Sequence, residues 1–216
     1  RETGRAVMSD ITLRAATHAD IPTLLRWDTD PVVIASGSDD PDAVIAWGED
    51  NDWAENIDLY QPEVWEYWIA ELDGRPIGCM QMCDPHREPT HYWGDIEPNL
   101  RALDIWIGEP DARGKGYGET MMRLAFARCF SDPLVTAILI DPLNSNTRAH
   151  KFYQRLGFVP THRQTFNDED DCLVHKLTRW RQNQRFWCFW CWLSGNSQQP
   201  INQRQTKRQC FARTRL

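Results

Sequence analysis

The sequence predicts an α/β (α+β) fold, a single domain in which helices flank a central mixed, mostly antiparallel sheet. Residues 103–158 have, in order, the patterns of an apolar strand, a glycine-rich turn, an amphipathic helix, a second strand and a second helix. Residues 64–82 have the pattern of two strands joined at Asp73-Gly74, a typical two-residue hairpin turn. With 216 residues, of which 41% are hydrophobic, the chain can build one such domain around a full core.

The segments before the hairpin predict one strand and two or three helices. Residues 11–14 alternate as a strand, and residues 17–27 have the cap and the apolar spacing of a helix. Residues 31–60 predict one or two short helices interrupted by acids, with Trp47 and Trp53 among them. Such a segment suits a hydroxylated, cationic ligand, because aromatic faces bind cations and carboxylates pair with ammonium groups. The alternative is a mobile acidic surface with the Trp side chains packed underneath.

The segments after the hairpin complete the predicted sheet. A polar loop leads into the central strand, and the second core helix is followed by two strands with an acidic turn between them. These segments are the loop at 85–99, the central strand at 103–107, the helix after the glycine turn up to residue 129, the strand ending at Asp141-Pro142, the helix beginning near Thr147, and the strands at 158–163 and 172–177.

We expect the folded domain to cover residues 8–179, with an N-terminal extension at 1–7 and a C-terminal extension at 180–216. The C-terminal segment is rich in Gln, Arg and Trp, has no acids and shows no regular period, so it is interpreted as accessory or non-native. A nucleic-acid-binding tail is the alternative. Residues 1–7 have no apolar leader and no run is long enough for a membrane span, which favours a cytoplasmic protein.

Charge and cysteine content narrow the expected partners. Residues 1–179 carry 17 of the 24 basic side chains and all 31 acidic ones, so this part of the chain should repel nucleic acid and attract cations. Seven scattered cysteines indicate a reducing compartment. Cys188-x-x-Cys191 lacks a second ligand pair and the six histidines form no spaced pair, so no metal site is expected.

The glycine-rich turn at residues 113–118 predicts an anion-binding cradle. Gly114, Gly116 and Gly118 can adopt positive φ and let a ligand approach the backbone. Several N–H groups then converge at a helix N-terminus, where the dipole favours an anion, and Arg113 and Lys115 add positive charge. A solvated turn that only precedes a helix is the alternative.

Two common phosphate motifs, GxGxxG and GxxxxGK[ST], are absent at this turn, which instead has Arg113-x-x-Gly116-x-Gly118. This pattern resembles the acetyl-coenzyme A signature of the GCN5-related N-acetyltransferases. Downstream, Asn146-x-x-Ala149, Tyr153 and Gly157-Phe158 match a second motif of that family in order and spacing. The resemblance implies an acetyl-CoA-dependent enzyme whose sheet is splayed beside the central strand, with a bulge expected near Trp106.

The resemblance also implies which residues hold the acetyl-CoA. Backbone groups of the central strand would contact the pantetheine arm and the thioester oxygen, and the glycine turn would hold the pyrophosphate. The implied cofactor-binding residues are Ile105, Trp106, Ile107, Arg113, Gly114, Lys115, Gly116, Tyr117, Gly118, Glu119, Asn146, Ala149 and Tyr153. Asn146 has a simpler alternative role, which is to cap the helix that begins near Thr147.

Two side chains are predicted to be catalytic. Strand alternation places Asp104 on the face opposite Leu103 and Ile105, where it could deprotonate an amine directly or through water. The alternative is a structural Asp bonded to loop amides. The resemblance makes Tyr153 the general acid for the departing thiolate, and an amphipathic core Tyr is its alternative.

A narrower resemblance concerns the substrate. Asp104 in its Leu-Asp-x-x-Ile-Gly-Glu-Pro context, Ile140-Asp141-Pro142 and Asp171-Cys172 are similar to segments of the aminoglycoside 6'-N-acetyltransferases. This implies direct acetyl transfer to an antibiotic amine, which confers resistance. The implied substrate-binding residues are Asp95, Glu97, Asp104, Asp141 and Asp171, although Asp141 before a proline is also a plain turn former.

Two other functions remain open at this level. The same chemistry could act on another amine, such as a siderophore precursor or a protein N-terminus. A non-catalytic acyl-CoA sensor would keep the cradle without the base or the acid, and the presence of both Asp104 and Tyr153 argues against it. The expected partner is a polycationic small molecule, with no nucleic acid and no membrane, and the protein is expected to be a monomer or a homodimer.

Overall fold

Seven strands form one sheet in the order β1-β2-β3-β4-β5-β7-β6 in the computed structural model, which describes residues 11–39, 52–166 and 170–179. Only β4 and β5 are parallel; the other neighbours are antiparallel, which confirms the mixed, mostly antiparallel sheet. The strands are β1 (Ile11–Ala15), β2 (Trp65–Leu72), β3 (Arg75–Cys83), β4 (Leu100–Trp106), β5 (Ala137–Ile140), β6 (Val159–Phe166) and β7 (Asp170–Thr178).

The described α-helices lie where the sequence predicts helices, whereas the 3-10 helix at Pro110–Ala112 was not predicted. The helix expected over 17–27 is a 3-10 turn followed by an α-helix, because Pro22 in the first turn of the α-helix has no N–H to continue the turn before it. The helices are η1 (His18–Asp20), α1 (Ile21–Asp28), α2 (Pro31–Gly37), α4 (Trp53–Asp58), η2 (Pro110–Ala112), α5 (Tyr117–Cys129) and α6 (Thr147–Leu156).

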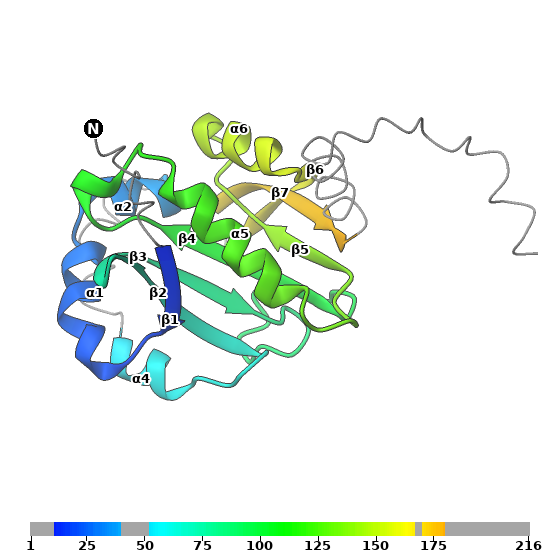
Figure 1. The fold of residues 1–216 in the computed structure, drawn as a ribbon. Coiled ribbons are helices and arrows are strands. Elements are labelled where there is room, and N and C mark those ends of the chain that lie inside the picture. The colour runs from blue at the N-terminus through cyan, green and yellow to red at the C-terminus, as the bar shows by residue number, and fades with distance from the viewer. Residues whose placement is uncertain (1–10, 40–51, 167–169, 180–216) are drawn as a thin grey trace, which may run out of the picture. The chain divides into compact units, whose positions relative to one another are not determined.

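The two faces of the sheet are covered by different helices (Figure 1). α5 and α6 pack on one face, where Met121, Phe126 and Leu156 share an apolar cluster with Met80 and Leu103 of the sheet. On the other face, side chains of α1 and α4 form a second cluster with β2 and β3; its buried members are Leu24, Trp27, Trp53, Tyr67, Ile69 and Cys79. The sheet is therefore the middle layer of the domain.

The hairpin turn forms as predicted. Asp73 has φ 51° and Gly74 has φ 79°, the positive values that a two-residue type I′ turn requires at both central positions. The turn pairs Leu72 with Arg75 and so sets the register between β2 and β3.

The central strands β4 and β5 diverge. Their pairing is limited to Leu100 with Ala137, Arg101 with Ile138 and Ala102 with Leu139. Beyond these pairs β4 continues to Trp106 along β3 alone, so the side of β4 that faced β5 is no longer covered by a strand. The splay implied by the family resemblance is therefore present. The bulge expected near Trp106 is not, since the β3–β4 register is regular from Cys79–Trp106 to Cys83–Ala102.

Some predicted features lie outside the described residues. They are the extension at 1–7, Trp47, residues 167–169 of the acidic turn, and the extension at 180–216 with its Cys188-x-x-Cys191. Within the described part of the chain, every helix is too short or too polar to cross a membrane.

Candidate active site

Asp104 lies between two apolar clusters on one face of the sheet. Strand alternation places Ala102, Asp104 and Trp106 of β4 on that face. Ala102 belongs to a cluster with Leu139, Leu143 and Phe166, whereas Trp106 packs against the cluster of α1 and α4. The gap between the clusters leaves a cavity above Asp104.

The cavity has a volume of about 740 Å³, a size typical of small-molecule sites. One end is formed by α2 and α4, and the other by the residues after β5 together with β7. Its described lining includes seven aromatic side chains, namely Trp53, Trp65, Tyr67, Tyr92, Trp93, Trp106 and Tyr153. Such a wall offers ring faces to the CH groups of a sugar and to cations.

The charged groups of this wall are all acidic. Asp28, Glu88, Asp104, Asp141 and Asp170 line the cavity, and no Lys, Arg or His is found among its described lining residues. Five carboxyl groups around one concave space focus a negative potential there. The cavity is therefore suited to a ligand that carries several positive charges.

Asp104 and Asp141 have shifted acid–base behaviour. Asp104 is open to the cavity, but the protein around it keeps most water away; this desolvation, and then the nearby Asp141, raise the pKa of Asp104 to about 7. Burial also raises the pKa of Asp141 to about 6, partly offset by a hydrogen bond from Tyr92. The two carboxyls titrate as a pair. In the part of the chain that the structure describes, no cation or hydrogen-bond donor contacts Asp104. Asp104 is therefore not bonded to loop amides, which the alternative of a purely structural Asp required.

Tyr153 enters the same cavity from α6. Burial raises the pKa of its hydroxyl, and the negative charges of Asp104 and Asp141 raise it further, so the group stays protonated at neutral pH. Its ring packs in the main core with Phe152 and Phe158. The ring is thus a core side chain, as the alternative held, and Tyr153 also lines the cavity.

The glycine turn has the backbone conformation of an anion cradle. Gly114 has φ 75° and Gly116 has φ 86°, and a Cβ built on either would meet no atom within 4 Å. Open space therefore lies beside both residues, and Gly116 is the N-cap of α5, whose first N–H groups have no intrahelical partner. With the uncovered side of β4, this fits an extended ligand that ends in phosphates.

Arg113 contacts other groups of the protein, and its predicted role at the cofactor stays a prediction. Its guanidinium donates to the carbonyl oxygens of Ile107 (2.9 Å) and Gly108 (2.7 Å) and pairs with Asp30 at 2.9 Å. Its charge is already neutralised, so it holds the shape of the turn and ties it to α2. Lys115 remains exposed.

Asn146 and Ala149 lie at the cavity end of α6. The Asn146 Oδ1 accepts a hydrogen bond from the Ala149 N–H at 3.0 Å, which confirms that Asn146 caps the helix. Both residues also line the cavity, so the capping role leaves the Asn146 amide group beside any ligand there.

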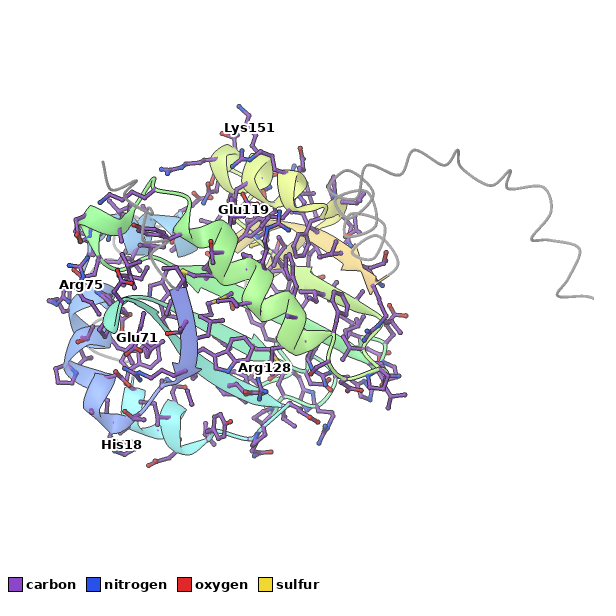
Figure 2. The ribbon with its side chains drawn as sticks, viewed as in Figure 1. His18, Glu71, Arg75, Glu119, Arg128 and Lys151 are labelled. Carbon is purple, nitrogen blue, oxygen red and sulfur yellow. The ribbon has the colours of Figure 1, made fainter. Side chains whose placement is uncertain are left out.

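Other predicted residues lie away from the cavity. Asp95 is exposed, Glu97 pairs with Lys176 at 2.5 Å, and Asp171 pairs with Arg163. None of these three acids lines the cavity, where Asp170 is found instead of Asp171. Glu119 is exposed near the start of α5 (Figure 2). It pairs with Arg123.

Sequence reasoning missed several residues of the cavity wall. Gln81 of β3 is the register partner of Asp104 and lies beside it, a position that could be found only once the two strands were paired. Asp28 accepts a hydrogen bond from the Trp53 Nε1 at 2.5 Å, so Trp53 is both a packed side chain and part of the wall. Tyr92 lies in the segment 85–99, for which the sequence predicted only a polar loop.

Comparisons with known proteins agree with this geometry. A family model described as an acetyltransferase (GNAT) domain matches residues 16–166. The chain is 31% identical over 150 residues, which are 68% of this chain and 73% of the relative, to aminoglycoside N(6')-acetyltransferase type 1 of Klebsiella pneumoniae. A kanamycin resistance protein of Rhizobium radiobacter is 35% identical over 72 residues, 33% of this chain and 67% of that protein.

Solved structures give the same family. The aminoglycoside acetyltransferase AAC(6')-Ib in complex with coenzyme A and kanamycin matches with a TM-score of 0.66 and 26% identity, over 81% of this chain and 98% of that one. The same enzyme with paromomycin and acetyl-CoA matches with a TM-score of 0.68 and 26% identity, over 81% of this chain and 97% of that one.

Proposed function

This chain belongs to the acetyltransferase (GNAT) family, whose members are acetyl-CoA-dependent N-acetyltransferases, and on that premise we propose that it is an aminoglycoside 6'-N-acetyltransferase. The observation that carries the proposal is the cavity, which has five acidic groups, an aromatic wall and no basic side chain among its described lining residues. A polycationic aminosugar complements that wall in charge and in surface chemistry. The names of the similar proteins support the same substrate class and the 6' position.

The residues at the splayed strand and the glycine turn fit acetyl-CoA. When bound, it supplies an acetyl group activated as a thioester. The first N–H groups of α5 and the backbone of Gly114 and Gly116 would hold its phosphates. The uncovered side of β4 around Ile105 and Trp106, with the Asn146 amide, would hold the pantetheine arm.

We assign the base to Asp104. A substrate ammonium must lose a proton before its nitrogen can attack, and a carboxyl with a pKa near the working pH is well matched to that task. Asp104 has such a pKa, because burial and Asp141 both disfavour its charge. Asp141 would hold the ammonium beside it, and Asp170 adds negative charge to the same end of the cavity.

Tyr153 is assigned the acid. Its hydroxyl keeps its proton at neutral pH and can give it to the sulfur released by the transfer. The transfer is direct, because the two thiols of the cavity wall are poor nucleophiles. Burial raises the pKa of Cys83 well above its ordinary value and that of Cys172 to about 12, which keeps both protonated.

The proposal is tested by measuring thiol release from acetyl-CoA with kanamycin, tobramycin, a siderophore-type amine and a peptide as acceptors. Turnover with the two aminoglycosides alone is expected, and mass spectrometry of the product should place the acetyl group on the 6' amine. Turnover only with the peptide or the siderophore-type amine would reject the substrate class and keep the reaction. Coenzyme A binding without turnover on any acceptor would favour a sensor.

A further inference from the structure

We propose that Tyr92 is a positioning residue for acetyl transfer, which holds Asp141 in one orientation and leaves its second carboxylate oxygen for the substrate ammonium. This inference rests on the proposed function of the cavity and adds a residue to it. The Tyr92 hydroxyl donates to the Asp141 Oδ2 at 2.8 Å, and both residues line the cavity. One carboxylate oxygen therefore has a fixed partner, and we place the substrate ammonium at the other.

The Tyr92 ring is held by aromatic packing on one side of the cavity. It stacks on Phe166 with a centroid distance of 4.5 Å and an interplanar angle of 8°. Trp93 meets both rings edge-on, at 5.8 Å from Tyr92 and 5.2 Å from Phe166. The ring therefore keeps its place when the hydroxyl is removed, which makes the hydroxyl testable by itself.

The backbone at Tyr92 is held by a buried carboxylate. Glu88 is 1% exposed, and its Oε1 accepts from the Tyr92 N–H at 2.7 Å. Its Oε2 accepts from both the N–H and the hydroxyl of Thr90 at 2.6 Å. The loop begins at Asp84, which pairs with the buried Arg101 of β4. The Glu88 N–H donates to the Asp84 carbonyl oxygen at 2.9 Å, so a chain of polar contacts connects β4 to the backbone of Tyr92.

The hydrogen bond from Tyr92 acts on the charge of Asp141. A donor to a carboxylate stabilises its ionised form, whereas the carboxyls of Asp104 on β4 and Asp170 on β7 oppose it. The other titratable groups that line this end of the cavity are Tyr153 of α6, Cys83 of β3, Cys172 of β7 and Glu88 of the loop. Without the donor, Asp141 retains its proton to higher pH, and the pair reaches its fully ionised state later.

The test is Tyr92→Phe, assayed for kcat/KM with kanamycin and acetyl-CoA from pH 5.5 to 9. We expect the acid limb of the profile to move to higher pH by about one unit. At pH values below the limb, kcat/KM should then be about 10-fold lower than in the wild type, and at pH 9 only a few-fold lower. Kanamycin affinity, measured by calorimetry without acetyl-CoA, should weaken more at pH 6 than at pH 8.5. An acid limb at the wild-type pH would overturn the proposal.

Tyr60→Phe is the matched control, since Tyr60 is 40% exposed and lies outside the cavity lining. Its profile should coincide with that of the wild type. The wild-type rate with kanamycin tests the substrate class, while the shift between variant and wild type tests Tyr92. If the wild type acetylates a different amine, the same two profiles are measured with that amine, and an unchanged acid limb still rejects the role of Tyr92. An equal loss of kcat/KM at every pH would also reject it, because a merely structural role gives that result.

Discussion

Asp104 lies on β4, Asp141 follows the end of the neighbouring strand β5, and both line one cavity, so Asp141 makes Asp104 harder to ionise. An isolated exposed carboxyl would be ionised at pH 7 but would be a weak base there. Desolvation in the cavity and a second carboxylate together raise the pKa of Asp104 to about 7. The chemistry at this scale comes from the pair rather than from either residue alone.

The first prediction concerns Asp104 as the base. Asp104→Asn should lower kcat for acetyl transfer by about 10²–10⁴-fold, because the amide cannot accept the proton. Coenzyme A affinity, measured by calorimetry, should stay within a factor of about two, since the cradle lies in a different segment. Asp58→Asn is the control, because Asp58 is an exposed acid paired with His18 outside the cavity. Equal turnover in Asp104→Asn and the wild type would remove Asp104 from the mechanism.

The second prediction concerns stability and pH. Asp104 has a pKa of about 7 in the folded protein, against roughly 3.9 when unfolded. Between these values the folded state binds more protons, so the free energy of unfolding falls as the pH rises from about 4 to about 7. Asp104→Asn removes the loss of stability that the ionisation of Asp104 causes. Its Tm should exceed that of the wild type by about 2–4 °C at pH 8, or roughly 1 kcal/mol after allowance for solvent in the cavity, and should show no gain at pH 4.

Thermal melts at the two pH values measure this difference. A gain of the same size at pH 4 and pH 8 would show that the amide stabilises the fold for a reason other than ionisation. A gain confined to pH 8, in a variant that has lost turnover, would mean that the wild-type protein gives up stability to keep a carboxyl at this position.

At the scale of elements, the divergence of β4 from β5 and the glycine turn before α5 lie next to each other in the chain. The pairing stops after Ala102 and Leu139, so the next residues of β4 carry backbone groups that no strand covers. The turn that follows β4 is held by Arg113 through two carbonyl oxygens and by its ion pair with Asp30. The uncovered backbone of β4 and the turn that Arg113 holds are therefore adjacent in the chain.

The third prediction tests the glycine turn against a matched glycine elsewhere. Gly116 has φ 86° and Gly74 has φ 79°, and both have open space where a Cβ would stand. Valine at either position is strained at such φ values, so both variants should lose stability by about 1–3 kcal/mol. Only Gly116→Val should abolish coenzyme A binding, measured by calorimetry at a temperature where both variants are folded. If Gly74→Val lost binding equally, strain alone would account for the effect.

At the scale of the whole molecule, the acidic groups of the cavity and those of the surface have different surroundings. Several surface acids are paired with basic residues, as Glu97 is with Lys176 and Asp171 with Arg163. The acids of the cavity face a space that has no basic group among its described lining residues. A cationic ligand in the cavity therefore faces several carboxyl groups at once.

The fourth prediction follows from that potential. Raising the KCl concentration from about 0.05 M to about 0.5 M should increase KM for kanamycin about 10-fold or more, because salt screens the attraction between the polycation and the cavity. The value of kcat should change by less than a factor of about two. Steady-state assays at saturating acetyl-CoA measure both constants. A KM that does not depend on salt would indicate that the acids of the cavity do not attract the substrate.

Local rules were sufficient for much of the fold. The strand and helix periods, the positive-φ turn at Asp73-Gly74 and the glycine turn before α5 depend on neighbours within a few residues. Strand alternation alone placed Asp104 opposite Leu103, and the helix-terminal pattern at Asn146 predicted its cap. These features can be read from the sequence because the backbone of a short segment limits the available conformations.

Only the tertiary structure decided which charged groups meet. It paired Arg113 with Asp30, moved Glu97 and Asp171 away from the cavity into ion pairs, and brought Tyr92 onto Asp141 from a loop 49 residues earlier. Such pairings depend on strand register and loop closure between distant segments, which no local pattern encodes. The sequence by itself therefore determined the elements, the glycine turn and the choice of Asp104 as the base candidate, whereas the folded chain determined the acidic wall around Asp104 and its raised pKa.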